Sequence, residues 1–87
     1  MKSKTTRRFR ELLDALPQEA QQQAREAHRL FRANPSSLHF KPLNSKHPLS
    51  SVRIGIHYHA LAYRKPDHLL WFWIGTHAEY DKIIARF

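Results

Sequence analysis

Apolar residues recur at helical spacing through the first third of the chain. Four of them share one face at positions i, i+3, i+4 and i+7, namely Phe9, Leu12, Leu13 and Leu16. This spacing predicts a short amphipathic helix that Pro17 interrupts. A second helix is predicted from Pro17 to Asn34-Pro35, because apolar positions continue at helical spacing at Ala20, Ala24, Ala27, Leu30 and Phe31. Two helices joined at a proline form an antiparallel hairpin, whose apolar stripe must pack on another layer.

The rest of the chain has the period and the apolar runs of strands. Apolar and basic residues alternate over 38–41, which predicts a first strand with one apolar and one basic face. A loop is predicted over 44–50, with Pro48 inside it. Further strands are predicted at 52–54, 58–64 and 69–74, with a turn over 65–68 before the last of them.

The apolar run from Leu69 to Ile74 ends at a helix start. Six consecutive apolar residues leave no polar face for solvent, which predicts a central strand covered on both sides. Gly75 ends the strand. Thr76 and Glu79 have the spacing of a capping box, in which each side chain accepts a hydrogen bond from the other residue's backbone amide. A short helix is therefore predicted to begin here.

His77 and Tyr80 fall on one face of the first turn of that helix. Exposed amides and the positive end of the helix dipole favour an anion at such a place, so a phosphate would fit. A purely structural interpretation competes with this one. Tyr80, Ile83, Ile84 and Phe87 follow helical spacing and could simply belong to the core.

The turn between the second and third strands decides which side chains share a face. If the loop is Gly55-Ile56-His57, Ile54 pairs with Tyr58 and Arg53 lies opposite His59. A two-residue loop would instead place Arg53 opposite Tyr58. We prefer the three-residue loop, because it gives a cleaner apolar face. An ordinary exposed strand remains the competing interpretation of the alternation from His57 to Ala60.

The order of these elements predicts an α+β domain. Helices come first and the connections between strands are short, so we expect an N-terminal helical hairpin packed on a mainly antiparallel four-stranded sheet, followed by a short C-terminal helix. At 87 residues the chain is expected to form one domain, residues 1–87, with a single core. The face of the sheet opposite the hairpin is then available for function.

Charge and histidine content point to a polyanionic partner. Fifteen Lys and Arg against seven Asp and Glu give a net charge of +8, and nucleic acid is the leading candidate for such a field. Six of the seven histidines lie in the strand-rich part, namely His39, His47, His57, His59, His68 and His77. That part therefore carries groups that exchange protons near neutral pH.

Composition also limits the setting. The chain has no cysteine, so a disulfide framework and a thiolate metal site are both excluded. The apolar run at 69–74 is far too short to span a bilayer. We expect a soluble, cytoplasmic protein that does not act at a membrane.

Several segments together resemble the RelE/ParE toxin superfamily. They are the two helices ending at Asn34-Pro35, the segment 39–43, the segment 52–61 and the segment 73–80. The resemblance covers nearly the whole chain and is nearest to the HigB-like and RelE-like branches. It implies the toxin of a bacterial type II toxin–antitoxin system, which in many relatives is an endoribonuclease that cuts mRNA on the ribosome. It also implies a cognate antitoxin as partner, which could cover the basic face with an acidic, amphipathic segment.

The resemblance also suggests site residues. Tyr80 stands where many members have a functional Tyr, and His77 lies where some have a catalytic His. His59 stands where relatives commonly have an Arg, which is a departure, because a His can also exchange a proton. The expected catalytic residues are His77, Tyr80, His59 and Arg53. The expected substrate-binding residues are Lys41, Lys46, His57 and Arg64.

These residue types suffice for RNA cleavage without a metal or other cofactor. Attack of a 2′-hydroxyl on its own phosphate needs a base, an acid for the leaving 5′-oxygen, and cations for the developing charge. Either His77 or His59 can be base or acid, Tyr80 would stack on or hydrogen-bond to the substrate, and Arg53 with Lys41 would stabilise the charge. Two alternatives remain open. One is a ParE-type toxin that inhibits DNA gyrase without cutting RNA, and the other is a metal-binding module built on His57 and His59.

Overall fold

The computed structural model describes residues 2–33, 41–42 and 49–86. The chain begins with a short strand and two helices, β1 (Lys2–Thr5), α1 (Arg7–Asp14) and α2 (Gln18–Ala33). Four strands and a last helix follow, namely β2 (Lys41–Pro42), β3 (Leu49–Ile54), β4 (Tyr58–Arg64), β5 (His68–Thr76) and α3 (His77–Ile84). The strands form one sheet in the order β1-β5-β4-β3-β2. All neighbouring pairs are antiparallel except β1 and β5, which run parallel.

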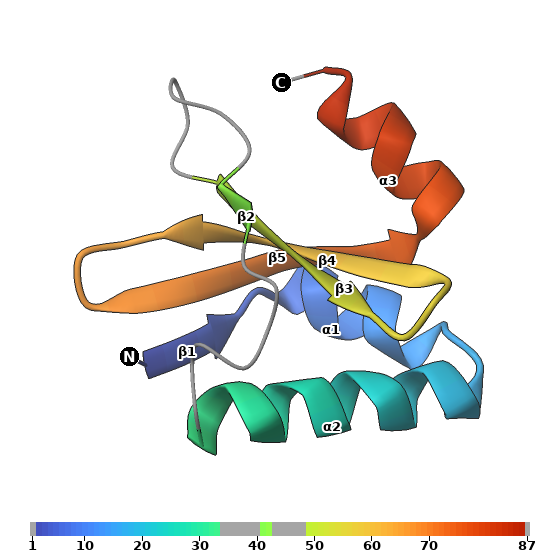
Figure 1. Cartoon of the computed structure of the whole chain (residues 1–87), viewed down its shortest axis with the longest axis horizontal. Coiled ribbons are helices and arrows are strands. Elements are labelled where there is room, and N and C mark those ends of the chain that lie inside the picture. The colour runs from blue at the N-terminus through green and yellow to red at the C-terminus, as the bar shows by residue number, and fades with distance from the viewer. Residues whose placement is uncertain (1, 34–40, 43–48, 87) are drawn as a thin grey trace.

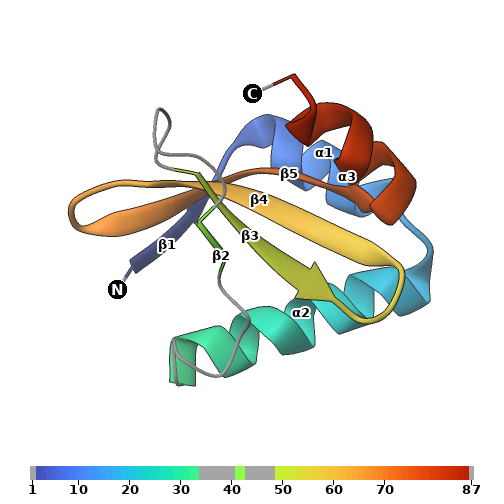
Figure 2. The same cartoon turned by 45° about the horizontal axis from the view of Figure 1, so that its top comes forward.

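The sheet separates two layers. Helices α1 and α2 lie on one face, and α3 rises on the other (Figures 1 and 2). This arrangement confirms the predicted α+β fold, with a helical hairpin on one face of a mainly antiparallel sheet and a short C-terminal helix. The face beside α3 is the one that the prediction left for function.

The hydrophobic core lies between the helical hairpin and the sheet. Its helix residues come from the predicted apolar stripes and are Phe9, Ala24 and Phe31. Its strand residues lie along β3, β4 and β5 and are Val52, Ile54, Ala60, Ala62, Leu69, Trp71 and Ile74. Trp71 lies at its centre, in an edge-to-face contact with Phe31 at 6.2 Å between ring centroids. Burial of these apolar side chains is the main force that holds the hairpin on the sheet.

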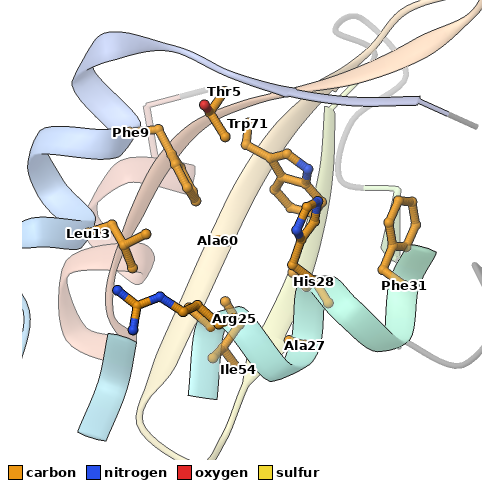
Figure 3. Close-up of a pocket in the computed structure, with 12 residues that line it drawn as sticks. Thr5, Phe9, Leu13, Arg25, Ala27, His28, Phe31, Ile54, Ala60 and Trp71 are labelled. Carbon is orange, nitrogen blue, oxygen red and sulfur yellow. The ribbon is translucent and has the colours of Figure 1, made fainter. Parts of the chain in front are cut away.

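A cavity of about 150 Å³ remains inside this layer. Phe9 and Leu13 of α1, Arg25 and His28 of α2, and Trp71 of β5 are among the side chains around it (Figure 3). Its lining is almost entirely apolar, so the hairpin covers the sheet without filling all the space beneath it.

The sheet has five strands where four were predicted, and β1 is the strand without a predicted counterpart. Lys2–Thr5 has no apolar residue, and therefore no strand pattern to recognise. Its strand conformation depends on β5, with Ser3 opposite Leu69 in a parallel register. The indole nitrogen of Trp71 also donates a hydrogen bond to the Ser3 hydroxyl at 2.6 Å. Because these partners are far apart in the chain, local periodicity could not reveal the strand.

The predicted boundaries hold for most other elements, with two corrections. Strand β5 continues through Gly75 to Thr76, because both residues still pair with β4, so Gly75 does not end the strand. Strand β3 begins at Leu49, whereas the prediction placed 44–50 in a loop and started the strand at Val52. Leu49 and Ser50 continue the antiparallel pairing with β4. Of the predicted first strand, Lys41 lies in β2. The rest of that prediction, 38–40, and residues 43–48 lie outside the described residues.

The turn between β3 and β4 has the preferred three-residue form. Ile54 pairs with Tyr58, and Arg53 pairs with His59, as the longer loop predicted. Gly55 has a φ of 61°, a conformation that glycine adopts at no steric cost. A Cβ at this position would also lie 2.6 Å from the side-chain oxygen of Gln23. The turn therefore approaches α2 closely and fixes the register of both strands.

The prediction that β5 is covered on both sides was wrong, because its two faces are buried to different extents. Leu69, Trp71 and Ile74 are buried under the helices, whereas Phe72 and Trp73 are only half-buried. The pairing with β4 shifts between Leu61 and Ala62, which marks a β-bulge. A run of apolar residues thus supplies one buried face and one partly open aromatic face.

Candidate functional site

The site lies where β5 passes into α3, on the face of the sheet opposite the helical hairpin (Figure 1). The predicted capping box is present. Thr76 accepts a hydrogen bond from the Glu79 amide, and the Glu79 carboxylate accepts one from the Thr76 amide at 3.0 Å. The same carboxylate also accepts a hydrogen bond from the Thr76 hydroxyl, and the two bonds from Thr76 to the carboxylate hold the pKa of Glu79 below its usual value. This cap fixes the direction in which α3 leaves the sheet.

Two histidines from different elements meet at this junction. His59 comes from β4 and His77 from the first turn of α3, and Nδ1 of His77 lies 2.8 Å from Nε2 of His59. A hydrogen bond between two imidazoles needs one donor and one acceptor nitrogen, so a single proton occupies it. The pair is thus arranged to hold and exchange a proton.

Tyr80 orients this pair from beneath. Its ring is stacked on His59 with 4.2 Å between centroids and 14° between planes, and 7% of the residue is exposed. Tyr80 is therefore buried, as the structural interpretation expects, and it also lies against a candidate catalytic side chain. The ring face that contacts His59 is not available to a substrate base in this arrangement.

Asp81 extends the pair to three groups and was missed by the sequence analysis. Its Oδ2 lies 3.4 Å from Nε2 of His77, one helical turn earlier in α3. Asp81 Oδ2, His77 and Nε2 of His59 consequently form a continuous chain of polar contacts. The i, i+4 spacing of His77 and Asp81 was a usable signal, but it gains meaning only when His59 is known to lie on the other side of the ring.

The electrostatics of His59 favour its neutral form. Burial lowers the pKa of His59 below 6.5, and the positive charges of His77 and Arg53 lower it further, while the Asp81 carboxylate opposes them. Arg53 is the Cα partner of His59 on β3, and its Nε donates to the Gly55 carbonyl at 3.1 Å. His59 is therefore suited to accept a proton near neutral pH, beside a guanidinium that attracts phosphate.

The backbone of the first turn of α3 is less open to an anion than predicted. The His77 amide donates to the His57 carbonyl at 2.9 Å, and the amides of Thr76 and Glu79 are used by the capping box. Amides that already donate to the protein are not free to hold a phosphate. Side chains are therefore the more available phosphate ligands here.

The structure brings together some predicted residues and separates others. His77, Tyr80, His59 and Arg53 form one cluster, and the His57 carbonyl contacts it through the His77 amide. Arg64 is at the other end of β4, five residues from His59 and roughly 17 Å along the strand. The structure does not bring Arg64 to the cluster. Lys41 lies in β2 opposite Ser51, and Lys46 lies outside the described residues.

Within the part of the chain that the structure describes, there is no group of three or more His, Cys, Asp or Glu side chains that could hold a metal ion. His57 and His59 are accordingly without a third ligand among those residues.

None of the helices in residues 2–33, 41–42 and 49–86 has the length and apolar character needed to cross a membrane.

The fold places the chain in a known structural class. A chain of the RelB–RelE antitoxin–toxin complex from Methanococcus jannaschii matches with a TM-score of 0.75 and 13% sequence identity, covering 92% of this chain and 96% of that chain. The protein thus has the RelE fold. The comparison with curated proteins gave no match.

The family follows from the sequence model described as ParE-like toxin domain, which matches residues 18–82. The chain belongs to the ParE-like toxin domain family. This confirms the resemblance to the RelE/ParE superfamily, and the protein is classed with the toxins of toxin–antitoxin systems.

Proposed function

We propose that this toxin is a metal-independent endoribonuclease that cleaves mRNA, acting on the ribosome. The observation that supports it most is the contact of 2.8 Å between His77 and His59 beside Arg53. A pair of imidazoles with unequal environments supplies an acid and a base, and the guanidinium supplies charge stabilisation. Inhibition of a protein target would not require such a pair.

In the proposed reaction the scissile phosphate enters between the two rings and replaces their mutual hydrogen bond. Nε2 of His59 is then free to act as the base and Nδ1 of His77 as the acid. Neutral His59 takes the proton of the 2′-hydroxyl, whose oxygen then bonds to phosphorus. The bond from phosphorus to the 5′-oxygen breaks, and His77 gives that oxygen its proton. The products are a 2′,3′-cyclic phosphate and a free 5′-hydroxyl. This assignment follows from the lowered pKa of His59 and from the carboxylate that faces His77.

The remaining residues support these two. Arg53 stabilises the charge on the phosphate oxygens. Tyr80 is a positioning residue, because its ring holds the His59 imidazole in place. Asp81 is also a positioning residue, since its carboxylate orients His77 and stabilises the imidazolium.

A cognate antitoxin is proposed as the partner that restrains this activity. The likeness to a chain of an antitoxin–toxin complex supports this proposal, as does the net charge of +8, which favours an acidic, amphipathic segment. The cytoplasm is the proposed location, because the proposed substrate is translated there.

Gyrase inhibition is the second candidate, and the match to the ParE-like family model favours it. One experiment separates the two. The purified protein is added to cell-free translation, and mRNA ends are mapped. The same preparation is tested for DNA gyrase supercoiling and for trapped cleavage complexes.

New mRNA ends with gyrase unaffected are expected. Ends carrying a cyclic phosphate, formed equally with excess chelator, would support transesterification without a metal. Intact mRNA together with gyrase poisoning would overturn the proposal in favour of the second candidate.

Replacing Asp81 by Asn is expected to lower the rate of cleavage about tenfold and to move the acidic limb of its pH profile to lower pH. Cleavage needs neutral His59, so the rate rises with pH through the pKa of His59. The Asp81 carboxylate raises that pKa, and its removal therefore lowers it. Histidine NMR titration measures the pKa shift of His59 without any substrate.

The matched control is Asp67→Asn, which removes a carboxylate that pairs with His68 at the opposite end of the sheet. It should leave both the pH profile and the His59 titration unchanged. An unchanged titration of His59 in Asp81→Asn would show that Asp81 does not act on the pair.

A further inference from the structure

The face of the sheet that carries the histidine cluster also carries aromatic side chains with no part in the proposed reaction. Tyr63 of β4 and Phe72 of β5 are half-buried and stacked, with 4.3 Å between ring centroids and 23° between planes. The Lys65 ammonium lies 5.8 Å from the centroid of the Tyr63 ring. Trp73 is half-buried next to Phe72. We name Tyr63, Phe72 and Trp73 the aromatic platform.

A β-bulge places two of these rings on the same face. Trp73 pairs with Leu61 and Trp71 pairs with Ala62, so Phe72 is an extra residue without a Cα partner on β4. In a regular strand, consecutive side chains point to opposite faces. Here Phe72 stacks on Tyr63, and Trp73 lies opposite Leu61. Leu61 and Tyr63 are two and four residues from His59, so they lie on the same face of β4 as His59. Bulges of this kind redirect side chains and are frequent next to active sites.

The aromatic platform is continuous with the histidine cluster. A Cβ built on Gly75 would lie 2.5 Å from Cζ2 of Trp73, so the indole lies directly over Gly75. Gly75 is in turn the Cα partner of His59. Tyr63 is four residues from His59 on the same strand, roughly 13 Å away. The rings therefore follow one line from the histidine pair toward the turn between β4 and β5.

We propose that the aromatic platform binds bases of single-stranded RNA beside the cleaved bond, with Lys65 on a backbone phosphate. The choice of RNA rests on the proposed function. Partly exposed rings next to a cation are suited to unpaired bases, which stack on them without sequence preference. A protein with a net charge of +8 adds the attraction for the phosphate backbone.

The test measures binding separately from cleavage. The full chain carrying His77→Ala binds a fluorescein-labelled single-stranded RNA, and anisotropy gives the dissociation constant over a series of salt concentrations. Tyr63→Leu and Phe72→Leu together remove the stacked rings but keep apolar side chains in their place. The matched control is Tyr58→Leu, which changes an aromatic residue on the same strand that packs against the core on the helix side.

The double variant is expected to bind about tenfold more weakly, with the same dependence of affinity on salt, because stacking carries no counterion release. Tyr58→Leu should bind like the parent. Lys65→Gln should lower the slope of log affinity against log salt by about 0.7, the value for one phosphate contact on a single strand.

A second arm leaves the protein unchanged and alters the ligand. An oligonucleotide with abasic sites should bind the parent about tenfold more weakly, and it should bind the double variant as the intact RNA does. Equal binding of intact and abasic RNA to the parent would overturn the proposal, as would equal binding of duplex RNA, whose bases are not free to stack.

The two proposals fail in different ways. If the double variant loses affinity but the wild type does not cleave mRNA, the proposal of RNA binding by the aromatic platform holds and the proposal of an endoribonuclease is wrong. Cleavage by the wild type with full affinity in the double variant would do the reverse.

Discussion

Replacing His77 by Ala is expected to lower the rate of mRNA cleavage about 10²- to 10⁴-fold, and His59→Ala is expected to do the same. Each change removes one of the two groups that exchange protons with the substrate in the proposed reaction. The two rings share one hydrogen bond of 2.8 Å, so they act as a unit. The double variant should therefore cleave almost as fast as the slower of the two single variants.

The pH profile gives a second measurement of the same pair. The pKa of His59 is lowered below 6.5, so His59 stays neutral, and able to accept a proton, at a pH where an ordinary histidine is protonated. The acidic limb of the wild-type profile is therefore expected below pH 6.5. Single-turnover cleavage of mRNA on purified ribosomes, followed from mildly acidic to mildly alkaline pH, measures the limb.

His28→Ala is the matched control, because His28 is on α2, on the other side of the sheet, where burial and Arg32 also lower its pKa. It should cleave at the wild-type rate. Wild-type cleavage by His77→Ala would overturn the acid and base assignment, and an acidic limb above pH 6.5 would contradict the role of His59 as base.

Replacing Trp71 by Ala is expected to destabilise the domain by about 3–5 kcal/mol. Trp71 contacts Phe31 and Phe9 in the core, and its indole N–H anchors β1 through Ser3. The side chain also lines the cavity of about 150 Å³, so its removal would enlarge a space that the surroundings already fail to fill. A domain of this size has a free energy of unfolding of about 4–13 kcal/mol, so the loss takes much of it.

Urea unfolding followed by circular dichroism measures this loss. The matched control is Phe72→Leu, at the adjacent position but on the opposite face of β5, where the ring is half-buried. It should cost less than about 1.5 kcal/mol, since an apolar side chain remains. Equal stability of Trp71→Ala and the wild type would show that the hairpin is not held through Trp71.

The neighbouring pair Trp71 and Phe72 shows where sequence analysis loses information. Six apolar residues in a row predicted burial on both sides, and the composition of the run could not show otherwise. The bulge between Leu61 and Ala62 decides that Trp71 enters the core while Phe72 and Trp73 share the opposite, partly exposed face. A bulge depends on how two strands pair, and neither strand alone encodes it.

The sequence by itself determined the local elements of this toxin. The two helices, the capping box at Thr76 and the three-residue turn at Gly55 follow from periodicity, cap spacing and turn chemistry, which act over a few residues. The turn also placed Arg53 opposite His59. Helical spacing made His77 and Tyr80 site candidates, and the resemblance to the superfamily suggested their roles.

Only the tertiary structure decided how these elements cooperate. The contact of His77 with His59 joins residues 18 positions apart, and β1 pairs with a strand more than 60 residues later in the chain. Asp81 acquires its proposed role only because His59 lies on the far side of His77. Such contacts depend on the register of strands and on the direction in which a helix leaves the sheet. Packing of the whole chain settles both, and no local pattern of residue types contains them.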